Sequence, residues 1–99
     1  MISRLVKMTF REEAIADFKQ VFEDSRNLIR AFPGNNHVEL LQDVNDPRIF
    51  FTFSLWDSEE ALNNYRHSEL FEATWAKTKI LFDDKPAAWS TEKLAEGQL

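Results

Sequence analysis

Aromatic and titratable side chains that could do chemistry gather between Trp56 and Phe82, in the stretch WDSEEALNNYRHSELFEATWAKTKILF. His67 could take up or release a proton near neutral pH, because an unperturbed imidazole has a pKa of about 6.5. Tyr65 could hydrogen-bond to an oxygen of a ligand, and Trp75 could stack on an aromatic ring. These residue types make the stretch the first candidate for a ligand site.

Each of these side chains also has a purely structural explanation. His67 could be an exposed histidine at a junction between two helical segments, and Tyr65 could be a core residue whose hydroxyl reaches the surface. Trp75 could fill space between a helix and a sheet, as could Phe71, which lies four residues earlier on the same helical face. We keep Tyr65 and His67 as candidate catalytic residues, and Trp75 and Phe71 as candidate substrate-binding residues.

Three further candidates lie nearer the N-terminus. Arg4 is the one charge among the alternate apolar residues of a predicted strand, and a buried arginine needs a partner. That partner could be a carboxylate of a second subunit, such as Glu39, or an anionic substrate, which makes Arg4 a third catalytic candidate. His37 could close a pocket from the sheet side or be a partly exposed strand-end residue. Ser3 could contact a substrate but has no base that would make it a nucleophile, and the isolated histidines do not favour a metal site.

Composition and charge exclude several classes of protein. The chain has 99 residues, which predicts one domain over 1–99 with an ordered core over 1–94 and a tail over 95–99. Its net charge of −5, without a basic run, argues against a nucleic-acid partner. No apolar run approaches the ~20 residues of a membrane span, and no signal-peptide pattern precedes the first strand, so we expect a cytoplasmic location. The lack of cysteine excludes disulfides and thiolate catalysis.

Hydrophobic periodicity predicts the first half of the fold. Residues 2–10 alternate between two sets of side chains, one mostly apolar, as in a strand. Thr9 and Glu12 have capping-box spacing, so a helix is predicted to begin near residue 10. Apolar residues then recur every three or four positions until Pro33-Gly34 ends the helix. Residues 37–44 form a weaker predicted strand.

The second half begins with the most apolar strand, residues 48–56, both of whose faces carry large apolar groups. Asp57 is predicted to cap the next helix, and Ser68 to start a second helical segment after a break near residues 66–68. A last strand is predicted over 87–94. The order β-α-β-β-α-β predicts a ferredoxin-like α+β fold, with a four-stranded antiparallel sheet and the helices on one face. The apolar second face predicts a homodimer formed through the sheets.

A family resemblance rests on the spacing Trp56-x-Ser58-x-x-Ala61-Leu62-x-x-Tyr65-x-x-Ser68-x-x-Phe71, which resembles the antibiotic biosynthesis monooxygenase domain. The order of the predicted elements agrees with that family over essentially the whole chain. The resemblance implies a dimeric α+β barrel, in which two ferredoxin-like sheets pack face to face. Some members oxidise aromatic polyketides or quinol-like substrates with molecular oxygen and without metal or flavin. The resemblance therefore implies a small phenol-type or quinol-type substrate and no cofactor.

A second branch of that family degrades heme, and this chain departs from its pattern. The branch has an asparagine on the first strand, a tryptophan early in the second helix and a proximal histidine ten residues later. Aligned through Trp56, these positions hold Ser3, Tyr65 and Trp75. Heme degradation is disfavoured because position 75 offers no imidazole as an axial ligand for iron.

The sequence leaves three functions open. The first is a cofactor-independent monooxygenase, which needs an apolar pocket, a group that shares the phenolic proton, and a cation or donor for the developing negative charge. The second is a module that binds a small aromatic ligand without turnover. The third is a dimerisation module whose pocket is filled by its own aromatic side chains.

Overall fold

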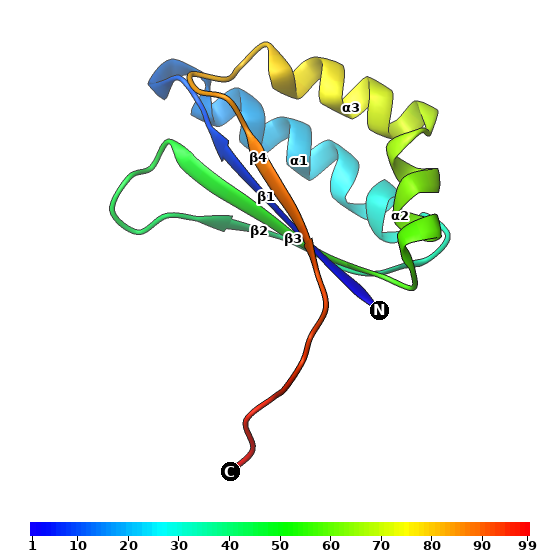
Figure 1. The fold of residues 1–99 in the computed structure, drawn as a ribbon. Coiled ribbons are helices and arrows are strands. Elements are labelled where there is room, and N and C mark those ends of the chain that lie inside the picture. The colour runs from blue at the N-terminus through cyan, green and yellow to red at the C-terminus, as the bar shows by residue number, and fades with distance from the viewer.

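Four strands and the helices between them follow one another in the order β-α-β-β-α-β, with the second helix in two pieces (Figure 1). A computed structural model describes all residues, 1–99. The elements are β1 (Ile2–Thr9), a short 3-10 helix η1 (Glu12–Ala14), α1 (Ile15–Arg30), β2 (Asn35–Gln42), β3 (Ile49–Trp56), α2 (Glu59–Arg66), α3 (Glu69–Lys79) and β4 (Ala87–Thr91). The predicted ferredoxin-like α+β fold is thereby confirmed.

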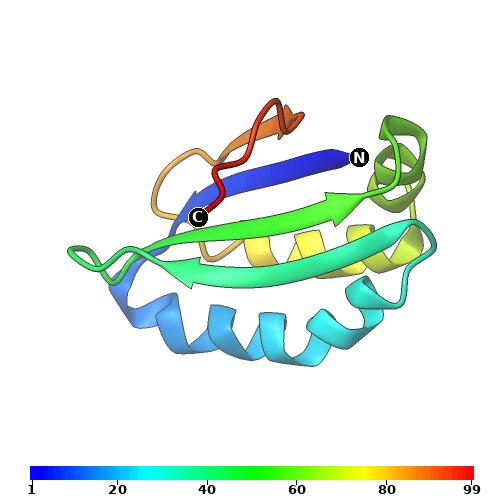
Figure 2. The same cartoon turned by 90° about the horizontal axis from the view of Figure 1, so that it is seen from below.

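The strands form one antiparallel sheet in the order β2-β3-β1-β4, so β1 and β3 occupy its centre. Arg4 on β1 lies opposite Ser54 of β3 and Ser90 of β4. Figures 1 and 2 show all the helices on the same side of this sheet. Because successive strand residues point to opposite faces, Arg4 and its two neighbours all face the helices.

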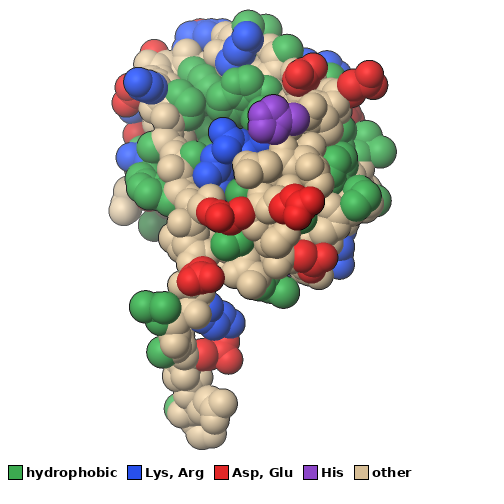
Figure 3. All heavy atoms as spheres, turned by 45° about the vertical axis from the view of Figure 1, so that its right-hand side comes forward, with side chains coloured by type: hydrophobic (Ala, Val, Ile, Leu, Met, Phe, Trp, Pro, Cys, Tyr) green, Lys and Arg blue, Asp and Glu red, His purple; other side chains and the backbone are tan.

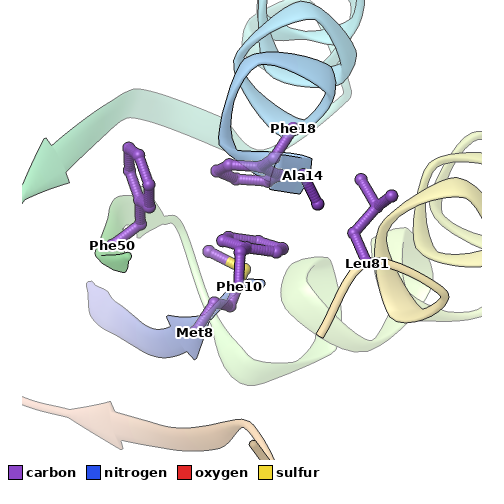
Figure 4. Packing of buried hydrophobic residues seen from close by; sticks show 6 residues of the cluster. All are labelled: Met8, Phe10, Ala14, Phe18, Phe50 and Leu81. Atoms are coloured by element: carbon purple, nitrogen blue, oxygen red, sulfur yellow. The ribbon is translucent and has the colours of Figure 1, made fainter. Parts of the chain in front are cut away.

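The main core lies where α1 crosses the sheet (Figure 4). Phe10 has no exposed surface, and its ring stacks on Phe18 of α1 with the ring centroids 4.0 Å apart. Phe50 of β3 meets both rings edge-on. The remaining buried members of this cluster are Met8, Ala14 and Leu81.

A second, smaller core surrounds Trp56 at the corner between β3 and α2. Trp56 is 1% exposed, and its indole N–H donates to the hydroxyl of Ser54 over 3.0 Å. Tyr65 stacks on the indole at 4.9 Å between ring centroids, and Phe32 meets both rings edge-on. This packing fixes the start of the helical stretch that carries the candidate site residues.

The face of the sheet away from the helices has no element of this chain above it (Figures 1 and 2). Leu5, Phe53 and Trp89 lie side by side across it, from β1, β3 and β4. Trp89 is half exposed and Leu41, on β2, is 45% exposed. Both faces of β3 are therefore apolar, as the sequence predicts, but only one is covered within the chain.

The structure confirms one of the predicted helix caps and corrects the other two. Ser68 caps α3, as predicted, and its hydroxyl accepts from the backbone N–H of Phe71 over 3.1 Å. The cap of α2 is Ser58 rather than Asp57, because Ser58 has the extended backbone of a cap and accepts from the Ala61 N–H. The predicted capping box at Thr9 is wrong: Thr9 belongs to β1, and neither η1 nor α1 has a side-chain cap.

Several strand boundaries also differ from the predicted ones. Strand β2 spans Asn35–Gln42, two residues earlier at each end than predicted, and its register shifts between Asn35 and His37. Strand β4 ends at Thr91, and the segment after it leaves the sheet (Figure 1). None of the helices has the length and apolar character needed to cross a membrane.

Candidate functional site

A cavity of about 380 Å³ lies between the helices and the sheet. Residues from α1, α2 and α3 line one side, and helix-facing residues of all four strands line the other. Of the 22 lining residues, 14 are hydrophobic. A volume of roughly 300–1,000 Å³ with a mostly apolar lining is usual for small-molecule sites, so the cavity is the candidate functional site.

The helical side of the cavity is an aromatic wall made by Tyr65, Phe71 and Trp75. Phe71 and Trp75 lie four residues apart on α3, and their rings are nearly parallel, 9° apart in plane with centroids 5.9 Å apart. Tyr65 meets Phe71 edge-on at 5.3 Å. The break between α2 and α3 sets this arrangement, because Ser68 caps α3 and donates to the Tyr65 carbonyl over 2.6 Å.

Two arginines supply the charge of the cavity, Arg4 from β1 and Arg66 from the last turn of α2. No aspartate or glutamate lines the cavity, and neither arginine takes part in any ion pair of the structure. The side chain of Arg4 donates one hydrogen bond, to the hydroxyl of Ser90 over 3.0 Å. Figure 3 shows basic side chains directly beside a hydrophobic patch on this side of the molecule.

Burial and charge shift two pKa values at the cavity. The pKa of Arg4 is lowered, first by desolvation and second by the positive charge of Arg66. Burial raises the pKa of Tyr65 to about 12. At neutral pH the cavity therefore holds a neutral phenol and two guanidinium cations close enough to repel each other.

The family of this chain follows from comparison with known proteins. A sequence model of the antibiotic biosynthesis monooxygenase family matches residues 1–77. The chain belongs to this family. A search of curated proteins finds none with significant similarity to the chain.

Solved structures agree with the family fold. A crystal structure of an antibiotic biosynthesis monooxygenase matches 96% of this chain and 100% of its own, with a TM-score of 0.90 and 17% identity. A conserved protein from Methanosarcina mazei Go1 matches 93% of this chain and 91% of its own, with a TM-score of 0.89 and 16% identity. Rv0793 from Mycobacterium tuberculosis matches 98% of each chain, with a TM-score of 0.88 and 18% identity. At these identities the likeness concerns the fold.

In this member of the antibiotic biosynthesis monooxygenase family, four of the seven sequence-predicted site residues meet at the cavity. They are Arg4, Tyr65, Phe71 and Trp75. Arg4 comes from the strand whose apolar parity faces the helices, and the three aromatic residues come from either side of the predicted helix break. The packing of the helices on the sheet therefore brings these four side chains together at one cavity.

The other three predicted residues lie outside the cavity lining. His67 caps the C-terminal end of α2, is exposed, and has its Nδ1 2.7 Å from the carbonyl oxygen of Asn63. Ser3 and His37 lie on the uncovered face of the sheet, because their strand parity is opposite to that of Arg4 and Val38. Neither His67 nor His37 is among the residues that line the cavity, and a part for either of them in the site stays a prediction.

Glu39 lies on the uncovered face of the sheet, next to His37. Its carboxylate is 3.0 Å from the Nε2 of His37, two residues earlier on the same side of β2. Arg4 projects from the opposite side of the sheet and bonds to Ser90. Within one chain, Glu39 and Arg4 are thus separated by the sheet.

Sequence reasoning missed Arg66 and the polar residues on the sheet side of the cavity, Thr52 and Ser54. Arg66 follows Tyr65 directly, so the two are roughly 100° apart around a helix and helical periodicity places them on different faces. A long side chain in the last turn can still reach a cavity that the helix end borders. Thr52 and Ser54 could have been predicted, because they alternate with Trp56 along the strand and so lie on the same face of the sheet as Trp56.

Proposed function

We propose that this family member is a cofactor-independent monooxygenase that acts on a small phenol-type or quinol-type substrate in the cavity. The observation that supports this proposal is the combination of an aromatic wall with two arginines and no acidic residue. The wall suits a flat aromatic ring, and the cations suit a substrate that becomes negatively charged. The cavity is large enough for a small ligand, which argues against a pocket filled by the chain's own side chains.

The proposed chemistry begins with loss of the phenolic proton. Two neighbouring guanidinium groups lower the pKa of a bound phenol, because an opposite charge favours the ionised form. The proton leaves to solvent past Arg66, which is exposed and borders the cavity. Tyr65 stays neutral, since its pKa is about 12, and so acts as a hydrogen-bond donor to the substrate oxygen rather than as a base.

The overall reaction balances without an added reductant. A quinol and O₂ give a hydroxyquinone and water: one oxygen atom forms a bond to the ring carbon and the other leaves in water. The electron-rich quinol anion supplies the electrons, first to O₂, and is itself oxidised. Arg4 and Arg66 stabilise the negative charge as it moves from the substrate to the reduced oxygen.

Oxygen uptake with a panel of quinols tests this proposal at neutral pH. We expect uptake that depends on the protein, and a loss of about tenfold or more in Arg4→Gln and in Tyr65→Phe. Arg26→Gln is the matched control, because Arg26 is an exposed residue paired with Glu23 on α1 and does not line the cavity. Uptake that no quinol elicits, or that both cavity variants retain in full, contradicts the proposal. His67→Ala, measured beside them, decides whether the imidazole takes part.

Binding without turnover is the second candidate function. It is favoured by one observation: no histidine or carboxylate, the side chains that most often serve as bases, lines the cavity. Tryptophan fluorescence separates the two candidates, because Trp75 borders the cavity and its emission reports an aromatic ligand there. Trp56 lines the cavity as well, so quenching that saturates without oxygen uptake, and that weakens in Trp75→Phe, supports a binding module.

We also propose that two chains associate through the uncovered face of the sheet. Leu5, Phe53 and Trp89 form an apolar strip on this face, with Leu41 beside it on the edge strand. A second copy of the same face would remove these side chains from water and complete the barrel that the family resemblance implies. Analytical ultracentrifugation should show a dimer that Phe53→Asp converts to a folded monomer; a wild-type monomer at high concentration contradicts the proposal.

A further inference from the structure

The two cavity arginines carry an unbalanced charge in a chain that is acidic overall. The protein has a net charge of −5, from 17 acidic and 12 basic residues. The six salt-bridge contacts use four of the twelve lysines and arginines, namely Arg11, Arg26, Arg48 and Lys93, together with the imidazole of His37. Arg4 and Arg66 are left out of these pairs although they share one cavity. Two like charges beside an apolar wall repel each other, and an anion bound between them would relieve this repulsion.

The unused hydrogen-bond donors of Arg4 also favour an anionic ligand. A guanidinium has five N–H donors, and the side chain of Arg4 uses one, to Ser90. Arg4 is partly buried and lines the cavity, and its bond to Ser90 lies in an exposed position, so its remaining donors are available to a ligand there. The side chain of Arg66 makes no hydrogen bond to another residue. Its position in the last turn of α2 suits the helix dipole, but this does not account for its place beside a second unpaired cation.

A phenol alone leaves this site only partly satisfied. An ionised phenol has one negative oxygen, whereas the cavity presents two cations with several free donors. A carboxylate has two oxygens in the fork geometry that a guanidinium matches, and it is ionised at neutral pH without help from the protein. A ring bearing both groups would engage both arginines and still present a phenolic hydroxyl to Tyr65.

We propose that the ligand of this cavity is an aromatic hydroxy acid, whose carboxylate is held by Arg4 and Arg66 and whose ring lies against Phe71 and Trp75. This inference rests on the proposal that the cavity is the ligand site, and it names the substrate class more narrowly. The carboxylate fixes which end of the ring enters the cavity. The two arginines carry one positive charge more than the carboxylate, and this remaining charge still favours ionisation of the hydroxyl, which lies toward Tyr65 and is the group left for oxidation.

A matched pair of probes tests the proposal by isothermal titration calorimetry. The first is a hydroxynaphthoate with its two substituents on opposite rings, and the second is the corresponding hydroxynaphthamide, which has the same shape without the charge. At neutral pH and low salt we expect the acid to bind about tenfold tighter or more, because hydrogen bonds to a charged group are roughly twice as strong. The preference should shrink at high salt as the charges are screened.

Variants assign this preference to the two arginines. Arg4→Gln and Arg66→Gln should each reduce the preference for the acid, and the double variant should abolish it while the amide still binds. Arg66 is exposed, so its variant folds even if Arg4→Gln is unstable. Arg26→Gln removes the same charge at an exposed position outside the cavity lining and should leave the preference unchanged.

Three results would overturn the proposal: equal affinity of the wild type for acid and amide, a preference that survives in the double variant, or no binding of either probe at millimolar concentration. The outcome is separable from that of the oxygenase proposal. If the acid binds selectively but no quinol or hydroxy acid is oxidised, the anion site stands and the oxygenase function fails. If quinols are oxidised and the acid binds no tighter than the amide, the oxygenase function stands and the anion site fails.

Discussion

Ionisation of Tyr65 offers a direct measurement of the cavity environment, because the chain has a single tyrosine. The near-ultraviolet absorbance of a phenolate therefore reports this one residue. Burial raises the pKa of Tyr65 from its ordinary value of 10.0 to about 12. We predict that the folded protein titrates with a midpoint near pH 12, and that the chain unfolded in guanidinium chloride titrates near its ordinary value.

The same shift predicts how stability depends on pH. Between pH 10 and pH 12 the unfolded chain loses the phenolic proton while the folded chain keeps it, so the free energy of unfolding falls as pH rises. The contribution is complete below pH 10 and is lost as pH rises to about 12. At 1.36 kcal/mol for each pKa unit, the loss amounts to roughly 2–3 kcal/mol.

Tyr65→Phe is the matched control for both measurements. It removes the absorbance change, and its free energy of unfolding should lack the part of the alkaline decline that Tyr65 causes. Lysines and arginines titrate in both proteins, so their effect cancels in the difference. Circular dichroism at each pH confirms that the folded state persists. A midpoint near pH 10 in the folded protein would mean that the hydroxyl is solvated, and would refute the assignment of Tyr65 as a buried neutral donor.

Three substitutions test how the fold positions the site, each by chemical denaturation. Gly34→Ala should destabilise the protein by about 2–4 kcal/mol, because Gly34 has φ +88° and a methyl group there would lie 2.5 Å from the Cβ of Ala61. Adding Ala61→Gly should restore part of this loss; no restoration would contradict the contact. Ser68→Ala should cost about 1 kcal/mol by removing the cap of α3, and an unchanged midpoint would contradict that role. Phe10→Ala should cost about 3–5 kcal/mol, since its ring is fully buried, and a smaller loss would mean that the core collapses around the cavity left behind.

Much of the fold was predictable because it depends on local patterns. Alternation in residues 2–10 and 48–56 predicts strands, and apolar recurrence up to Pro33 predicts a long helix. Ser68 predicts the break that separates α2 from α3, since a capping serine satisfies backbone N–H groups wherever it occurs. The two cap errors have a local cause as well: Thr9 is held in β1 by its pairing with Ile49, which outweighs its capping spacing.

The cavity was only partly predictable, because its members come from separate elements. The sequence indicates Tyr65, Phe71 and Trp75 as one group, since they share a helical stretch. It cannot indicate that Arg66 joins them, because helical periodicity puts neighbouring residues on different faces. It also makes His67 a candidate beside Tyr65, whereas the structure places His67 at the exposed end of the helix with its ring at the Asn63 carbonyl.

The amino-acid sequence by itself determined the order and type of the elements, the helix break and the membership of the family, because these depend on residue spacing along the chain. The tertiary structure decided which side of the sheet the helices cover. Strand β3 is apolar on both faces, so alternation alone does not predict whether the face that carries Trp56 or the face that carries Phe53 packs against the helices. That choice places Arg4 inside the cavity, leaves Ser3 and His37 on the opposite face, and brings Arg66 beside Arg4.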